Sequence, residues 1–246
     1  DLTPRMLCEI YFAPNHVRAW RRDTYEAAGG HNAKMTAADD HDLVCRTYMT
    51  GKPFCHIPEC LYLYRKHEKN SFKALHRQIR AQQEANRDKY LYTLICEWCR
   101  REKLPTLNLD SNSMVKLQLA FADSAVGAVF ASDYMQRVPI ENVPTMMNEF
   151  YRVLKPGGFL CINVPGTEGR GAFQDPRHRS FWNINSILYY TENTFAKYIP
   201  EYTGRFQVVR SSTAFPSKWH FDNRVSYVSA DLCALKGQRQ PGLCKI

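Results

Sequence analysis

The chain has 246 residues, which suits one or two domains with a buried core, since 44% of them are hydrophobic and 13% are aromatic. Its formal net charge of +9 suits anionic ligands, but the basic residues are mixed with acids along the whole chain, which disfavours nucleic acid as a partner. No apolar run approaches the roughly 18 residues of a membrane span, and the N-terminal residues lack the order of a signal peptide, so we expect a cytoplasmic protein without a membrane span.

The first region, which extends to about Phe72, predicts short elements. A helix is expected over residues 22–28, where Gly29-Gly30 ends it, and another over residues 40–50, where Gly51 ends it. An apolar stretch over residues 60–64 follows Pro58 and predicts a strand.

A long helix is predicted next. The stretch FKALHRQIRAQQEANRDKYLYTLICEWCRREK contains neither Gly nor Pro, and the apolar residues of its second half recur every three or four positions. Its first half is polar almost all round. The pattern therefore indicates a solvated connector whose second half docks on a neighbouring domain.

From about Leu104 onward, strand and helix signals alternate as in an open α/β sheet. Lys155-Pro156-Gly157-Gly158 marks the end of a helix, because Pro cannot continue the hydrogen-bond ladder and Gly can adopt the left-handed conformation. The predicted elements are strands over 125–132, 159–164, 206–211 and 225–235, an amphipathic helix over 143–154 and an aromatic helix over 186–199.

A polar loop, residues 165–183, directly follows the strand at 159–164, and such loops bind ligands in α/β folds. Asp175 and His178 of its DPRH motif are candidates for substrate contact. His178 could act as general base for a sugar hydroxyl, because imidazole titrates near neutrality. Alternatively, Asp175 caps a turn and His178 packs beside Trp182.

The third region resembles the second half of a class I S-adenosylmethionine-dependent methyltransferase. The resemblance is carried by LAFADSAVGAVFAS, MNEFYRVLKPGGFLCINVPG and GRGAFQDPRHRSFWN. It implies a Rossmann-like sheet whose last strand is antiparallel, with S-adenosylmethionine as the cofactor. The chain departs from the family in its donor site, because no GxGxG motif occurs anywhere in it.

The resemblance also implies three cofactor-binding residues. Asp110, after the apolar LNL, matches the ribose-binding acid of the family, although it could equally be a turn aspartate. Asp133 follows the strand at 125–132, in a segment where the family often has His or Glu. Gly166 begins the polar loop.

The first region resembles the C-terminal part of a family 2 glycosyltransferase with the GT-A fold. A GG turn, an acidic pair that opens a helix, IPE before a strand and YRxH appear in that order. The resemblance implies Asp39 and Asp40 as catalytic acids, with Asp40 as the base, and His67 near a metal-bound diphosphate. It thus implies a nucleotide-sugar and a divalent metal. The alternative is that the acids only favour a helix N-terminus.

The sequence therefore predicts an α/β protein in which a partial GT-A segment (1–72) and a connecting helix (73–103) precede a partial Rossmann-like methyltransferase sheet (104–246). We expect a transferase of glycan or polysaccharide biosynthesis with a glycan or sugar substrate, and a second chain that completes the truncated domains. The alternative is a catalytically inactive remnant that acts as a glycan-binding or assembly module.

Overall fold

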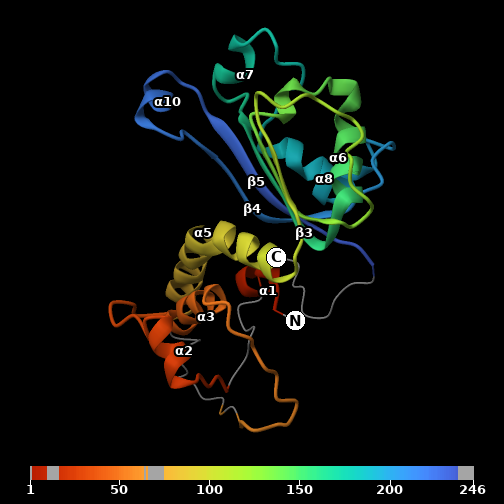
Figure 1. Cartoon of the computed structure of the whole chain (residues 1–246). Helices are drawn as coiled ribbons and strands as arrows, with labels where there is room; N and C mark the ends of the chain where they lie inside the picture. The colour runs from red at the N-terminus through yellow and green to blue at the C-terminus, as the bar shows by residue number, and fades with distance from the viewer. Residues whose placement is uncertain (1, 10–16, 64, 66–74, 238–246) are drawn as a thin grey trace. The chain divides into compact units, whose positions relative to one another are not determined.

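The computed structural model describes residues 2–9, 17–63, 65 and 75–237. The chain divides into two compact units, Asp1–Glu102 with Gln240–Ile246, and Lys103–Arg239. Figure 1 shows the helices of the first unit and the sheet of the second. His67, the predicted metal-site residue, lies outside the described residues.

The first unit is helical in the part that the structure describes. Its helices are α1 (Pro4–Glu9), α2 (Arg22–Ala27), α3 (Asp39–Met49) and α5 (His76–Arg101), and α5 packs against α1 and α3. The helices predicted at 22–28, at 40–50 and along the polar stretch are confirmed. The core includes Leu7, Leu43, Val44, Tyr48, Leu91, Leu94, Ile95 and Trp98.

The strand predicted over 60–64 is wrong for residues 60–63, which form no regular secondary structure; residue 64 lies outside the described residues. Leu61 and Leu63 are exposed. An apolar run makes a strand only where a partner strand satisfies its backbone groups, and the described residues of this unit contain no strand.

Asp42, a buried acid on α3, organises a polar network inside the first unit. Its carboxylate accepts a hydrogen bond from the Tyr90 hydroxyl at 2.6 Å and from Arg46 Nε at 2.8 Å, and Lys89 Nζ lies 3.7 Å away. Burial raises the pKa of Asp42, but the hydrogen bonds and positive charges outweigh it, so the net pKa lies below the ordinary value. The carboxylate is therefore held in its charged form.

The second unit is built on a five-stranded sheet with the order β1-β2-β3-β5-β4. The strands β1, β2 and β3 are parallel, and β5 pairs antiparallel with both β3 and β4. The antiparallel final strand was predicted and is confirmed. The strands are β1 (Thr106–Leu109), β2 (Val126–Ser132), β3 (Leu154–Pro165), β4 (Phe206–Ala214) and β5 (Tyr227–Ala234).

Short helices connect these strands. They are η1 (Met135–Arg137), η2 (Ile140–Asn142), α6 (Val143–Val153), α7 (Gly171–Gln174), η3 (Ile184–Ile187), α8 (Leu188–Thr191), α9 (Asn193–Ala196) and α10 (Lys218–Asp222). The single helix predicted over 186–199 is wrong, because this stretch is divided among η3, α8 and α9. The chain is extended at Glu192, with φ −115° and ψ 124°, and this residue separates α8 from α9.

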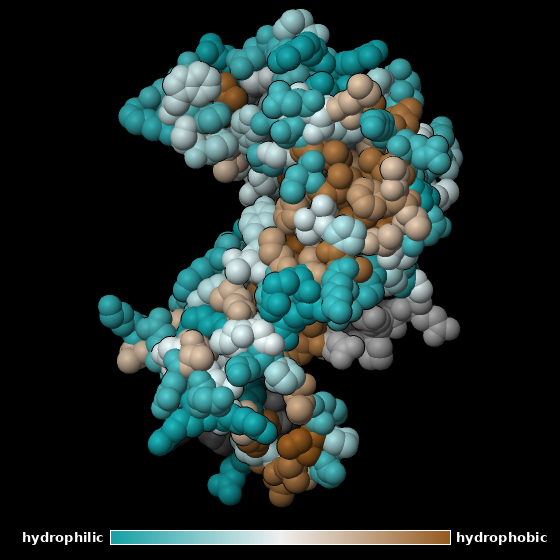
Figure 2. Space-filling view, viewed as in Figure 1, coloured by the Kyte–Doolittle hydropathy of each residue, from teal (hydrophilic) through white to brown (hydrophobic). Residues whose placement is uncertain are grey.

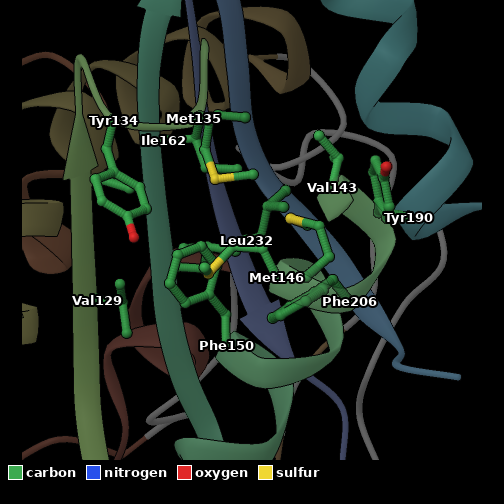
Figure 3. Packing of buried hydrophobic residues seen from close by; sticks show 14 of the residues in the cluster. Val129, Tyr134, Met135, Val143, Met146, Phe150, Ile162, Tyr190, Phe206 and Leu232 are labelled. Atoms are coloured by element: carbon green, nitrogen blue, oxygen red, sulfur yellow. The ribbon is translucent and has the colours of Figure 1, made fainter. Parts of the chain in front are cut away.

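The core of the second unit lies between the sheet and the helices α6 and α8, which Figure 1 draws on the same side of the sheet. In Figure 3, Phe150 and Met146 of α6 point toward Val129 of β2, Ile162 of β3 and Leu232 of β5. The amphipathic helix predicted at 143–154 is thus confirmed, with its apolar face on the sheet.

Helix α6 passes into β3 without an intervening loop. The helix ends at Val153 and the strand begins at Leu154, so the Lys-Pro-Gly-Gly segment lies inside the first half of the strand. Gly157 has φ +80°, a value that L residues rarely adopt, which accounts for glycine there. The predicted stop of the helix before Pro156 is confirmed.

The surface combines polar and apolar areas. Figure 2 shows hydrophobic side chains gathered on the second unit around the place where Figure 1 labels α6. Large apolar side chains of this unit that stay exposed include Met114, Ile140 and Phe173. Among the described helices, none has the length and hydropathy that crossing a membrane requires.

Candidate functional site

Three of the sequence-predicted residues meet at one edge of the sheet. Because β1, β2 and β3 are parallel, their carboxyl ends lie side by side, and Leu109 pairs with Ala131 while Ser132 pairs with Asn163. Asp110, Asp133 and Gly166 are the residues that follow these three strands. This edge is where open α/β sheets bind ligands.

Asp110 begins a tight turn after β1. Its Oδ1 accepts hydrogen bonds from the backbone N–H groups of Asn112 and Ser113 and from Ser113 Oγ, each at 2.9 Å. The Ser113 side chain and the Asn112 backbone N–H are the main groups that lower the pKa of Asp110, so the exposed carboxylate is ionised at neutral pH. The turn reading of the sequence is confirmed, and Oδ2 takes no part in these three bonds.

Asp133 sits directly after β2 with φ 53°, the left-handed conformation. Its backbone N–H donates to Asn163 O at 2.8 Å, and its Oδ1 accepts from the Tyr227 hydroxyl at 3.0 Å and from Gln136 Nε2 at 3.3 Å. Burial and the Asp133 carboxylate raise the pKa of Tyr227, so this phenol stays protonated. Asp133 therefore joins the ends of β2, β3 and β5.

Gln136 on η1 is a residue of this site to which the sequence pattern gave no role. It is 3% exposed, and its backbone carbonyl accepts hydrogen bonds from the N–H groups of Arg179 and Ser180. Ser180 Oγ donates to Met135 O at 2.7 Å. The loop after β3 is thus fastened to η1. Within the described residues, Gln136 Oε1 is a buried acceptor without a hydrogen-bond donor.

Gly166 and its neighbouring glycines pack against the segment that leads into β5. The Gly166 N–H donates to Ser226 O at 2.8 Å, so it is engaged within the fold. A Cβ on Gly171 would lie 2.6 Å from Val225 Cγ1, and one on Gly169 would lie 2.6 Å from both Arg224 O and Ser226 N. These glycines allow a close approach of two backbones, which the sequence alone did not reveal.

Gly169→Ala should therefore destabilise the second unit. The added methyl group meets backbone atoms rather than a movable side chain, so we expect a loss of about 1–3 kcal/mol in the free energy of unfolding. Urea unfolding followed by circular dichroism would measure it. An unchanged midpoint would mean that the two backbones can separate freely, contrary to the packing described.

Asp175 and His178 lie in a turn of the same loop. Asp175 binds the Arg177 guanidinium through both carboxylate oxygens, at 3.1 and 2.8 Å, and accepts the Arg177 N–H at 2.9 Å. His178 Nδ1 donates to Ala172 O at 3.0 Å. This bond leaves Nε2 as the ring nitrogen that can accept a proton, but the side chain is only 8% exposed. The reading in which Asp175 caps a turn is confirmed.

A pocket of about 530 Å³ opens above the same edge of the sheet. Its walls come from the three segments that follow β1, β2 and β3, so residues far apart in sequence meet there. The lining residues are Met114, Val115, Leu117, Arg137, Pro139, Asn142, Arg177 and Arg179. The pocket is thus apolar in its walls and positively charged, and its volume falls in the usual range for ligand sites.

Arg137 connects the pocket to Asp110. Its Nη1 donates to Ser113 O at 3.0 Å and to Asp110 O at 3.4 Å, and it also binds Ser111 O. The guanidinium therefore holds the turn that presents the Asp110 carboxylate.

The predicted acids of the first unit, Asp39 and Asp40, occupy the first turn of α3. Asp40 binds the Arg18 guanidinium, and its Oδ1 accepts the His41 N–H at 2.8 Å. Burial raises the pKa of Asp40, but the hydrogen bond from Arg18 and its positive charge lower the pKa by more than burial raises it, so the net shift is downward. Within the described ranges, no three His, Cys, Asp or Glu side chains are grouped to hold a metal ion.

Part of the chain matches a known family. Residues 80–162 match the model of a family described as a methyltransferase domain, and this segment covers about a third of the chain, from near the start of α5 almost to the end of β3. The parallel strands and the antiparallel final strand form a mixed α/β fold whose central sheet resembles that of Rossmann-like methyltransferases, in agreement with this match. A comparison with curated proteins gave no match.

Solved structures resemble the chain only distantly. A chain from a Haloferax volcanii complex that contains the Trm112 methyltransferase activator is 14% identical, with 50% of this chain and 60% of that chain covered and a TM-score of 0.36. The [4+2]-cyclase SpnF is 14% identical, with 51% of this chain and 57% of that chain covered and a TM-score of 0.35. An S-adenosylmethionine-dependent methyltransferase from Mesorhizobium loti is 11% identical, with 49% of this chain and 68% of that chain covered and a TM-score of 0.34. The chain thus spans less than two thirds of the first two, and scores this low identify no function.

Proposed function

We propose that the second unit binds S-adenosylmethionine along the carboxyl edge of β1 and β2 and acts as the methyl-transfer domain of a transferase. The observation that carries this proposal is the pair of carboxylates, Asp110 and Asp133, which follow adjacent parallel strands. In each of them Oδ1 is held by internal hydrogen bonds in which Oδ2 takes no part. The methyltransferase family match over residues 80–162 supports it.

The residues at this edge fit one part of the cofactor. Ionised carboxylates suit the ribose hydroxyls and the amino group of S-adenosylmethionine, since both groups donate hydrogen bonds. Asp110 would hold the ribose hydroxyls and Asp133 the amino group. The protein lacks the glycine-rich turn that contacts the methionine part of the cofactor in the family, because its sequence has no GxGxG. The Gly166 N–H cannot replace that turn, since it donates to Ser226 O.

The side chains around this edge would orient the reaction. When bound, S-adenosylmethionine supplies an electrophilic methyl group. Tyr227 and Gln136 fix the Asp133 carboxylate, and Arg137 fixes the Asp110 turn. His178 is the proposed base for an acceptor hydroxyl, through Nε2, with its ring oriented by Ala172 O. This role requires a local opening of the turn at residues 175–178, which precede the point where the loop is tied to η1, since the imidazole is almost buried.

Asp110→Asn should weaken binding of S-adenosylhomocysteine by about 10- to 150-fold, because a hydrogen bond to a charged group contributes about 1.5–3 kcal/mol. Asparagine keeps the Oδ1 acceptor of the turn, so the fold should remain intact. Isothermal titration calorimetry would measure the affinity. Asp222→Asn on α10 is the matched control, since this exposed acid pairs only with Lys218 among the described residues. Absence of binding by the unaltered protein would contradict the proposal.

The acceptor, the glycosyltransferase activity and the partner chain that the sequence predicts stay proposals. A glycan or sugar acceptor, and a nucleotide-sugar with a divalent metal for the first unit, are supported only by the resemblance of residues 1–72 to glycosyltransferases. A second chain that completes the site would supply the missing contacts to the methionine part. Light scattering of the purified protein with and without candidate partners would test for such a chain.

A further inference from the structure

The pocket above β1, β2 and β3 has a charge that neither the fold nor the proposed cofactor explains. Three of its lining residues are arginines, Arg137, Arg177 and Arg179, and none is acidic. S-adenosylmethionine carries a sulfonium and an ammonium cation, which uncompensated guanidinium groups would repel, and one carboxylate, which they would attract. The pocket therefore suits an anionic group rather than the cationic and hydroxyl groups proposed for the Asp110 and Asp133 carboxylates.

The three arginines differ in how far their charge is already neutralised. Arg177 forms a bidentate ion pair with Asp175, so its charge is balanced. The contacts of Arg137 with the 110–113 turn are to backbone carbonyls, which carry no charge, so they leave its positive charge uncompensated. In the part of the chain that the structure describes, the Arg179 side chain has no ion pair or hydrogen bond. The pocket thus holds two uncompensated charges.

Arg179 is nevertheless held in place at its backbone. Its N–H donates to Gln136 O at 2.7 Å, and the preceding turn is closed by the His178 N–H, which donates to Asp175 O at 3.1 Å. The loop therefore carries the Arg179 side chain on a fixed support beside η1, whose last residue is Arg137. A pair of guanidinium donors that extend from a fixed backbone suits the planar or tetrahedral oxygens of an oxyanion.

The other walls of the pocket are apolar. Met114, Val115, Leu117 and Pro139 line it, and Met114 is 74% exposed. An exposed apolar side chain in a charged pocket gains by contact with an apolar part of a ligand, since such contact removes its surface from water. The Asn142 amide, also in the lining, adds a polar group that can donate or accept.

We propose that this pocket binds an oxyanion, phosphate or carboxylate, carried on an apolar body, with Arg179 and Arg137 on the anion and Met114 and Leu117 on the body. The proposal goes beyond the methyl-transfer function and does not depend on it. If the second unit does transfer a methyl group, the pocket would place an acidic acceptor beside the Asp110 turn, because Arg137 belongs to both.

The test uses small probes that separate the anion from the apolar body. Phenyl phosphate, benzoate and phenol are titrated into the 246-residue protein by isothermal titration calorimetry at low salt. We expect phenyl phosphate, benzoate or both to bind, and phenol to bind far more weakly. The stronger of the two anions distinguishes a phosphate ligand from a carboxylate ligand.

Three variants then locate the site. Arg179→Gln should weaken binding of the anion by about tenfold, because it removes the ion pair with the anion. Arg179→Glu should abolish binding, because it places a negative charge beside the anion. Neither change removes a contact that holds the fold. Arg205→Gln is the matched control: this exposed arginine precedes β4, at the opposite edge of the sheet, and should leave the affinity unchanged.

Two outcomes would overturn the proposal. One is that neither anion binds, or that phenol binds as tightly as phenyl phosphate. The other is that the Arg179 variants bind the anion as well as the unaltered protein does. A parallel titration with S-adenosylhomocysteine keeps the two proposals separate, because binding of the anion without binding of S-adenosylhomocysteine would refute only the methyl-transfer function.

Discussion

Replacing Phe150 by alanine should lower the free energy of unfolding of the second unit by about 3–5 kcal/mol, the range for removing a buried phenylalanine. Phe150 is fully buried on α6, and its ring lies 6.4 Å from that of Tyr134, measured between centroids. Figure 3 shows it between the helix and the sheet. The substitution leaves a cavity that the surrounding strands cannot close.

Urea unfolding followed by circular dichroism, together with hydrogen exchange of the 154–165 segment, would measure the effect. Phe221→Ala on α10 is the matched control, because that side chain is 64% exposed and should cost little. Equal losses for the two variants would mean that the α6 face is not the core of this unit.

Asp42→Ala should cost the first unit about 3–5 kcal/mol, because removing one partner of a buried ion pair leaves the others without compensation. Arg46 and Tyr90 lose a hydrogen bond each, and Tyr90 is itself buried. Hydrogen exchange along α3 and α5 would report the loss in this unit separately from the second. Asp88→Ala is the control, since the Asp88 side chain is 54% exposed beside Arg87.

The contribution of Asp42 should also depend on pH. The pKa of Asp42 is lowered in the folded state, so its stabilising effect is fully present above the unfolded pKa of about 3.9 and is lost as the pH falls through the folded value. The difference in stability between the unaltered protein and Asp42→Ala should therefore be constant near neutrality and narrow on acidification. A difference that grows toward acid pH would contradict an ionised Asp42.

Much of the second unit could be predicted from local sequence. The run AVGAVFAS, the helix over VPTMMNEFYRVL and the Pro-Gly-Gly stop each carry a signal within a few residues, because periodicity, apolarity and backbone restriction act locally. The aromatic stretch after Ser186 is not a single helix, since Thr191 and Asn193 are weaker helix formers and the chain is extended at Glu192 between them.

The candidate site could be predicted only in part. Asp110, Asp133 and Gly166 could be placed at one edge because the carboxyl ends of parallel strands must meet there. The charged pocket could not, because Arg137, Arg177 and Arg179 come from two loops and are dispersed among acids in the sequence. The buried Asp42 was also missed, since the neighbouring Asp39 and Asp40 gave a sufficient reason for acids at a helix start.

The loop after β3 is tied at both of its ends, through Gln136 to η1 and through Ser226 and Arg224 to the segment before β5. Such a loop cannot swing aside as a lid. Entry of a ligand into the pocket and its release should instead depend on movement of residues 111–118, which form only turns and irregular backbone. The rate at which an occupant escapes would then be set by that short stretch, whereas its identity would be set by the arginines on the immobile side.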